Sequence, residues 1–134
     1  MEQQALIDDP VKPSKSKRFE DDFARQCRAH RLPAFERGHR FAAVLGRRWE
    51  FDFAFVEWKL ALEVEGLIVR RIGGQVVTMG RHANPAGFRA DCEKYATAAI
   101  LGWTVIRFEQ NQVKDGTALA YAQRVLTARG WKRD

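Results

Sequence analysis

Cysteine and long apolar runs are both scarce in this sequence of 134 residues. The two cysteines, Cys27 and Cys92, lie in separate segments without a CxxC spacing, which argues against a disulfide framework and a cysteine-based zinc site. A reducing cytoplasm is therefore the expected compartment. The apolar runs are only a few residues long, so no membrane span is expected. Residues 1–10 are polar and acidic, which does not fit a secretory signal.

Acidic residues are outnumbered, and the surplus of positive charge falls in one part of the chain. Lys and Arg total 23 against 17 Asp and Glu, which gives a net charge of +6. Residues 23–48 contain seven Arg and one acid, whereas the rest of the chain balances at 16 basic and 16 acidic residues. A basic surface favours an anionic partner, and nucleic acid is the first candidate. The side chains that we expect on a phosphate backbone are Arg25, Arg28, Arg47, Arg48 and Arg81.

The distribution of apolar and turn-forming residues predicts one α/β domain. Residues 1–17 hold few large apolar side chains and are expected to form a basic-ended arm, whereas residues 18–134 form the domain. The residues around Gly73-Gly74 form either a second hairpin or a strand and a flexible loop. The predicted order is helix (18–31), strand pair (48–66), the ambiguous segment (67–83), helix (84–101), strand (103–108) and helix (116–129).

Residues 48–66 alternate with period two, which is typical of a β-hairpin with two different faces. A turn at Glu57-Trp58 would pair Phe53 with Leu62, and Asp52 with Glu63. One face would then be apolar, made of Phe51, Phe53, Phe55, Leu60, Leu62 and Val64. The other would carry three carboxylates with two small neighbours: Asp52, Glu63, Glu65, Ala54 and Ala61.

Neighbouring carboxylates on a strand pair repel each other unless a cation lies between them. Ala54 and Ala61 are small enough to leave room for one. Oxygen ligands suit Mg²⁺ or Mn²⁺ better than zinc, and such a metal can polarise a phosphodiester and lower the pKa of a bound water. The alternative interpretation is a solvated hairpin face whose charge is neutralised by the Arg-rich segment.

Asp52, followed after ten residues by Glu63-Val64-Glu65-Gly66, resembles the core motif of the PD-(D/E)XK nucleases. The run FDFAFVEWKLALEVEG, then a His, a helix with DxxK and the strand GWTVIRF resemble small endonucleases related to the very-short-patch repair enzyme and similar phage proteins. The resemblance covers residues 19–109. It implies a restriction-endonuclease-like core, in which a mixed four-stranded sheet is flanked by helices in the order α-β-β-β-α-β.

The resemblance also implies a site for a divalent metal, Mg²⁺ or Mn²⁺. Asp52 and Glu63 would be its ligands, often joined by the carbonyl of Val64, and Glu20 matches a glutamate of the family's first helix that can complete the site. The sequence departs from the motif at Glu65, where the family has Lys. Lys94 on the next helix is our candidate for the missing cation. His82 is a second candidate, as a general acid or base or as a partner of the leaving group.

Together these features predict a metal-dependent DNA endonuclease that acts on duplex or branched DNA in a bacterial or phage-infected cytoplasm. The main alternative is a nucleic-acid-binding module that keeps the fold without catalysis, which the missing Lys favours. A third is an interaction protein that binds a host enzyme. Cleavage of both strands usually needs two active sites, which is compatible with a homodimer.

Overall fold

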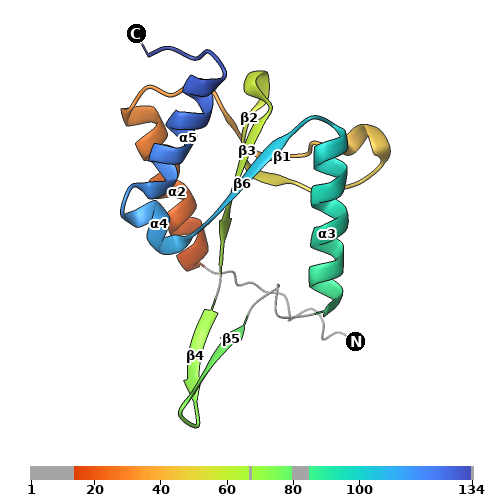
Figure 1. The fold of residues 1–134 in the computed structure, drawn as a ribbon, viewed down its shortest axis with the longest axis vertical. Helices are drawn as coiled ribbons and strands as arrows, with labels where there is room; N and C mark the ends of the chain where they lie inside the picture. Colours follow the sequence, from red (N-terminus) through yellow and green to blue (C-terminus); the bar gives the residue numbers. More distant parts are fainter. Residues whose placement is uncertain (1–13, 67, 80–84, 134) are drawn as a thin grey trace.

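The computed structural model describes residues 14–66, 68–79 and 85–133. A four-stranded sheet lies at its centre, with the strand order β1-β2-β3-β6 (Figure 1). The first three strands are antiparallel, and β3 and β6 run parallel, so the sheet is mixed. This confirms the α/β class and the four-stranded mixed sheet. The strands are β1 (Glu36–His39), β2 (Phe51–Phe55), β3 (Leu60–Glu65) and β6 (Thr104–Glu109).

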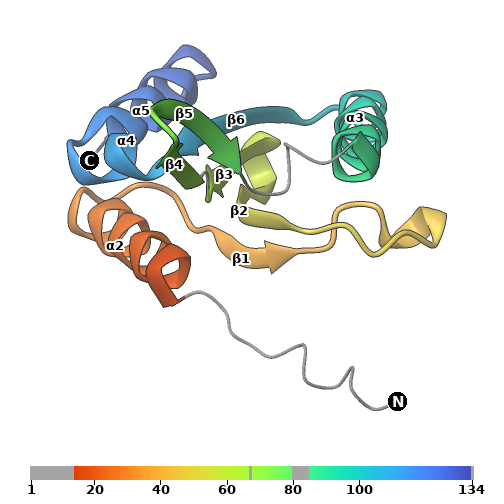
Figure 2. The ribbon, with the colours of Figure 1, turned by 90° about the horizontal axis from the view of Figure 1, so that it is seen from below.

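Helices cover the sheet on both sides, so neither face of the central strands is open to solvent. On one side lie α2 (Ser14–Ala29), α4 (Gln110–Lys114) and α5 (Thr117–Ala128). On the other side α3 (Pro85–Ile100) lies alone (Figures 1 and 2). No helix in the described ranges has the length and apolar character that a membrane crossing requires.

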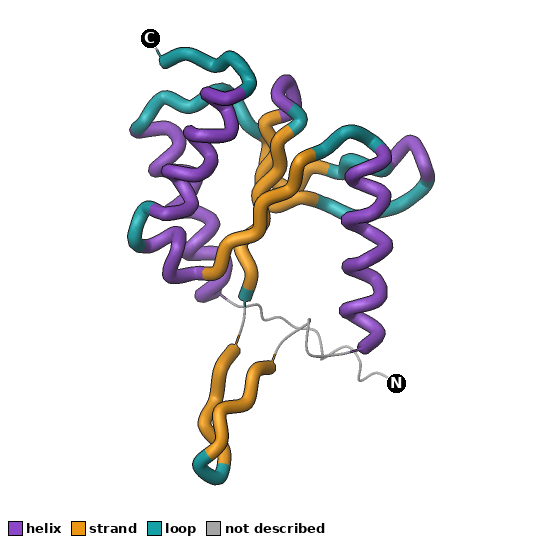
Figure 3. Tube along the Cα trace, viewed as in Figure 1, coloured by secondary structure: helices purple, strands orange, loops and turns teal. Residues whose placement is uncertain are grey.

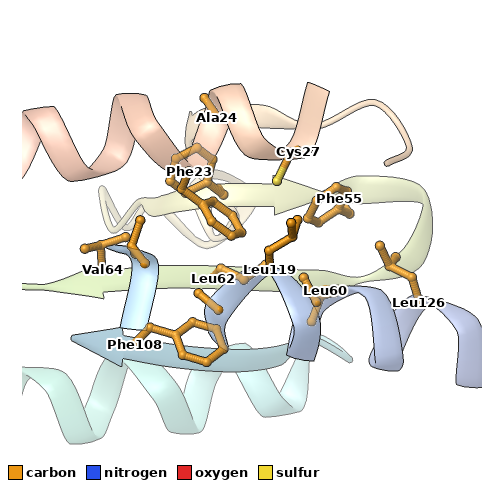
Figure 4. Close-up of a cluster of buried hydrophobic side chains, with 14 residues drawn as sticks. Phe23, Ala24, Cys27, Phe55, Leu60, Leu62, Val64, Phe108, Leu119 and Leu126 are labelled. Carbon is orange, nitrogen blue, oxygen red and sulfur yellow. The ribbon is translucent and has the colours of Figure 1, made fainter. Parts of the chain in front are cut away.

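The larger of the two cores fills the space between the sheet and α2 and α5. Phe23 of α2 meets Phe53 of β2 edge to face, with 5.0 Å between ring centroids. Cys27 lies beside them, and Leu119 and Leu126 of α5 close the core (Figure 4). Burial of these side chains holds the helices on the sheet.

The smaller core lies under α3. It contains Phe51, which was predicted to lie on the same apolar face as Phe53. Phe51 packs edge to face on Trp103 and not beside Phe53, although all three Phe of β2 are buried as predicted. Ala54 and Ala61 lie in the same core beneath Ala98. These alanines are fully buried, so the interpretation that they leave room for a cation is wrong: their small size lets α3 approach the sheet.

The register of the β2–β3 pair is as predicted over Phe53–Phe55, whereas the predicted pair of Asp52 with Glu63 lies outside the paired residues. Phe53 lies opposite Leu62, and a 3₁₀ turn over Val56–Trp58 joins the strands where the sequence predicted a turn. Lys59 closes this turn in the left-handed conformation, with φ of +51°. The paired residues start at Phe53, and just beyond them the N–H of Val64 donates to the side chain of Asp52. At this point the alternation of side chains is interrupted, so Phe51 and Phe53 lie in different cores, Phe51 under α3 and Phe53 under α2.

Residues 68–79 resolve the ambiguous segment as a second hairpin. Strands β4 (Ile68–Ile72) and β5 (Gln75–Met79) pair antiparallel and form a separate two-stranded sheet. Gly73 and Gly74 form its turn with φ of +58° and +80°, a conformation that side-chain-bearing residues rarely adopt. Figure 3 shows this hairpin extending away from the four-stranded sheet.

Three elements differ from the prediction. Helix α2 begins at Ser14, four residues inside the predicted arm, so the acids at 20–22 lie beyond its first turn. The third antiparallel strand of the sheet is β1, from the polar segment ERGH, and not a strand of the 67–83 segment. The short helix α4 was missed because five residues are too few to show a period. Residues 1–13 of the predicted arm lie outside the described residues.

Candidate active site

A cavity of about 200 Å³ opens where β2 and β3 separate, beside α3. Its lining is almost wholly polar and contains five carboxylates, one ammonium group and one phenol. The residues around it are Glu50, Asp52, Glu63, Glu65, Gly66, Asp91, Lys94 and Tyr95. The cavity therefore collects the carboxylates of the predicted acidic face together with one cation from the facing helix.

Asp52 is held by the neighbouring strand. Its Oδ2 accepts a hydrogen bond of 2.8 Å from the N–H of Val64. Its pKa is raised to about 7, first by burial and then by the negative charge of Glu63, although the bond from Val64 lowers it. The carboxylate is thus fixed in position and lacks enough positive charge around it to ionise at its ordinary pH.

Glu63 is 6% exposed, and two side chains of α3 hold it. Lys94 Nζ lies 3.1 Å from Oε1 and 3.0 Å from Oε2, so one ammonium group bridges both oxygens. The hydroxyl of Tyr95 donates to Oε1. Burial and this bond to Glu63 raise the pKa of Tyr95, so the phenol keeps its proton and remains a donor.

Glu65, where the motif of the resembling family has Lys, is engaged by a cation from the sheet. Arg107 lies two residues before the end of β6, and its Nε is 2.8 Å from Oε2 of Glu65. The guanidinium also lies over the ring of Tyr95, at 4.6 Å from the centroid. Arg107 therefore joins Glu65 and Tyr95 at one wall of the cavity.

Of the predicted catalytic residues, the structure brings Asp52, Glu63, Glu65 and Lys94 together around one cavity. Glu20 lies on α2 and does not line this cavity. Its Oε1 is 3.7 Å from Arg37, and its charge reaches Asp52 only as a contribution that raises the pKa of that carboxyl. His82 and Arg81 lie outside the described residues.

Four of the predicted DNA-binding arginines lie in the same basic segment of the sequence but in two different places in the structure. Arg25 and Arg28 lie on α2, where Arg25 pairs with Asp22 and Arg28 covers the ring of Phe35 at 5.4 Å. Arg47 and Arg48 lie on the loop before β2, on the α3 side of the sheet (Figure 2). The basic segment thus contributes arginines to two separate parts of the molecule.

The donor set of the cavity fits an oxygen-ligated divalent cation in part. No three His, Cys, Asp or Glu side chains of the described residues converge closely enough to hold an ion. Asp52 and Glu63, however, are neighbouring carboxylates whose repulsion helps to raise the pKa of Asp52, and a cation between them would relieve it. These two residues are the ones that could hold Mg²⁺ or Mn²⁺, with water or substrate oxygens as further ligands.

Four residues at or beside the cavity were missed from the sequence: Glu50, Asp91, Tyr95 and Arg107. Asp91 precedes Lys94 by three residues on α3, a spacing that places both on one helix face and could have identified it. Arg107 lies opposite Glu63 in the parallel β3–β6 register, and no local pattern predicts such a pairing.

The raised pKa of Asp52 predicts how an isosteric variant behaves when no metal is bound. Above the ordinary pKa of an aspartate, the folded protein retains a proton that the unfolded chain releases, so the wild type loses stability as the pH rises from about 4 to about 7. Asp52→Asn removes this loss. We expect the variant to gain about 4 kcal/mol in free energy of unfolding at pH 8 and almost nothing at pH 4.

Urea denaturation in EDTA at the two pH values measures this difference. Glu57→Gln, at the exposed turn of the same hairpin, is the matched control and should change little at either pH. Equal stability of Asp52→Asn and wild type at pH 8 would contradict the raised pKa.

Compared with protein-family models, with curated proteins and with solved structures, the chain shows no match. The functional interpretation therefore depends on the geometry of this cavity and on the chemistry of the residues around it.

Proposed function

We propose that this protein is a divalent-metal-dependent DNA endonuclease that hydrolyses phosphodiester bonds. The observation that supports the proposal most strongly is the cavity in which Asp52, Glu63 and Glu65 meet Lys94. Such a set combines oxygen ligands for a metal with a cation for phosphate charge. Arginines at two separate places on the same small domain would supply the attraction for the DNA backbone.

In this proposal the carboxylates of Asp52 and Glu63 bind Mg²⁺ or Mn²⁺. When bound, the metal supplies a Lewis acid for the phosphodiester and lowers the pKa of a coordinated water. Val64 fixes the orientation of Asp52 through its N–H, and Tyr95 fixes one oxygen of Glu63. The protein thus prepares the donor oxygens before the substrate arrives.

Lys94 has the role that the motif lysine has in the resembling family. Its ammonium group lies in the cavity and is only 12% exposed, so its charge is weakly screened. Stabilising the negative charge that develops on the phosphate is the task that we assign to it. In the absence of DNA the same group neutralises Glu63, which explains why the two are paired.

The test is cleavage of supercoiled, branched and single-stranded DNA by the wild-type protein in Mg²⁺, in Mn²⁺ and in EDTA. We expect cleavage of at least one DNA form with either metal and none in EDTA, since the carboxylates alone provide no activated water. A protein that binds these DNAs but leaves all of them intact in both metals would contradict the proposal.

A second candidate is a nucleic-acid-binding module that keeps the nuclease-like site without catalysis. The pairing of Glu65 with Arg107 favours it, because a carboxylate and not an ammonium group occupies the motif position. Titration of DNA affinity against salt and metal separates the two. The binding module predicts an affinity that falls with salt and does not respond to Mg²⁺, whereas the nuclease predicts coupling of affinity to metal.

A further inference from the structure

Strand β6 leaves one edge of the four-stranded sheet open. In the described part of the chain β3 is its one strand neighbour, and Figure 2 shows β6 and β1 at the two opposite edges of the sheet. The residues of β6 pair with β3 in an unbroken register from Thr104 to Glu109, and none of them is Pro or Gly. Such a regular edge is a template for a further strand, and monomeric proteins usually disrupt it.

The opposite edge of the sheet is disrupted in this way. Strand β1 has only four residues, and its pairing with β2 passes over Gly38, whose φ of +62° bends the strand. Glu36 and Arg37 add charge at this edge, which also disfavours pairing. Of the two edges of this sheet, β6 is therefore the one that can accept a further strand.

The backbone of β6 is oriented for such pairing. The N–H of Thr104 donates to the carbonyl of Lys59 at 2.9 Å, so the backbone groups of Thr104 face β3. Because backbone groups alternate in direction along a strand, those of Val105 and Arg107 point away from β3. A strand laid along this edge would pair through these two residues.

The helices on either side of β6 present uncharged side chains beside this edge. On α5, Tyr121 is 47% exposed, and its ring centroid lies 6.2 Å from that of Phe108 of β6. On α3, the ring of Tyr95 lies under the guanidinium of Arg107 of β6, and the exposed Ala99 lies one turn further along the same helix face. The edge is thus flanked by apolar surface on one side and by a small side chain, which lets a neighbouring helix approach, on the other.

We propose that β6 pairs antiparallel with β6 of a second copy of this chain, so that the two four-stranded sheets join into one continuous sheet. A twofold axis normal to the sheet would relate the copies and place each α3 beside its counterpart and each α5 beside its counterpart. The open edges of both copies are then covered at once, and the disrupted β1 edges end the assembly at two chains. This interface does not depend on the proposed function.

The charges of β6 favour a second copy as the partner and select a register. The chain has a net charge of +6, but β6 contains one Arg and one Glu, so two copies of the strand do not repel each other by net charge. Two registers overlap the strands most fully, one centred on Ile106 and the other on Arg107. The second places the two Arg107 side chains directly opposite each other, which is destabilising. Ile106 therefore lies on the twofold axis.

Sedimentation equilibrium of the full-length protein, in EDTA and without DNA, tests the pairing. Wild type should form a dimer at micromolar concentrations. Val105→Pro should raise the dissociation constant by about 100-fold or more, because proline removes the outward N–H and obstructs the partner strand while an edge strand tolerates it.

A pair of surface variants tests the same interface without altering the strand. Tyr121→Lys should raise the dissociation constant by about tenfold, since it places a positive charge beside the joined edges on both copies. Val44→Lys is the matched control, because it adds the same charge at a site on the loop before β2 that is 85% exposed. It should leave the dimer unchanged.

Cysteine crosslinking tests the register. Two Ile106 residues on the axis would form a close pair with Cα atoms about 4.5 Å apart, a separation that a disulfide can bridge. In a Cys92→Ser background, Ile106→Cys should give a disulfide-linked dimer on mild oxidation. Val105→Cys should not, because its two copies would lie diagonally, about 7–8 Å apart.

A wild type that sediments as a monomer at about 100 µM would overturn the inference. A dimer that both Val105→Pro and Tyr121→Lys leave intact, or that Val44→Lys dissociates in their place, would overturn it equally. Crosslinking of Val105→Cys in preference to Ile106→Cys would contradict the register. Because these measurements use neither DNA nor metal, their outcome is separate from that of the cleavage assay.

Discussion

Asp52→Asn should lower the rate of DNA cleavage by about 1,000-fold or more. The substitution keeps the shape of the side chain and an oxygen that can accept the bond from Val64, but it removes the charge that would bind the metal. Losing about 4 kcal/mol of transition-state stabilisation corresponds to this factor. Single-turnover cleavage of the preferred DNA in saturating Mg²⁺ measures the rate.

Glu57→Gln provides the control, because it removes the same charge from the same hairpin at a position outside the cavity. We expect its rate to stay within about twofold of wild type. Because Asp52→Asn is expected to be the more stable protein without metal, loss of activity in that variant cannot be ascribed to unfolding. A variant that cleaves as fast as wild type would remove Asp52 from the mechanism.

Lys94→Met should destabilise the metal-free protein by about 3–5 kcal/mol. The substitution keeps most of the length of the side chain but leaves the carboxylate of Glu63 buried without its bridging cation. A buried charge that has lost its partner is costly, whereas removing both charges is often neutral. The double variant Glu63→Gln/Lys94→Met should therefore recover most of the lost stability.

Urea denaturation of the four proteins in this cycle measures the interaction energy. Lys132→Met, at an exposed position near the C-terminus, controls for the loss of one positive charge. Mg²⁺ should stabilise Lys94→Met more than wild type, since a cation at Asp52 and Glu63 replaces the missing ammonium charge. If Lys94→Met alone is as stable as wild type, the ion pair with Lys94 does not offset the free-energy cost of burying the carboxylate of Glu63.

The predictable part of the fold is the part in which local pattern and global structure agree. Period-two alternation was enough to set the register of β2 and β3 over Phe53–Phe55, because a slip by one residue would have turned these buried side chains to the other face. The helix of residues 85–100 was also predictable, since Asn84-Pro85 and Gly102 are typical of its start and end.

Other features depend on contacts between distant segments, which no local pattern records. Strand β1 is exposed and polar, and only its pairing with β2 makes it a strand. Phe51 faces α3 because the β2–β3 pairing changes at Asp52, which alternation alone does not predict. The two cysteines differ in the same way, since Cys27 of α2 is buried and Cys92 of α3 is exposed.

The carboxylates of the candidate site were predictable from the sequence, but only some of the residues that bind them were. The family resemblance predicted Lys94 as a candidate site residue, and in the structure its ammonium group pairs with the carboxylate of Glu63. Tyr95 follows Lys94 directly, and adjacent helix residues usually face different ways, so spacing gave no reason to expect both on one carboxylate. The arginines show that proximity in sequence does not ensure proximity in space, since Arg28 lies on α2 and Arg47 on the loop before β2.

The most direct test of a metal-dependent active site is a crystal structure of the protein soaked in Mn²⁺, with anomalous scattering used to locate the ion. The proposal predicts an anomalous peak within coordination distance of both Asp52 and Glu63, with Lys94 displaced from at least one oxygen of Glu63. A cavity without such a peak at saturating Mn²⁺, with Lys94 still bridging both oxygens, would contradict the central claim.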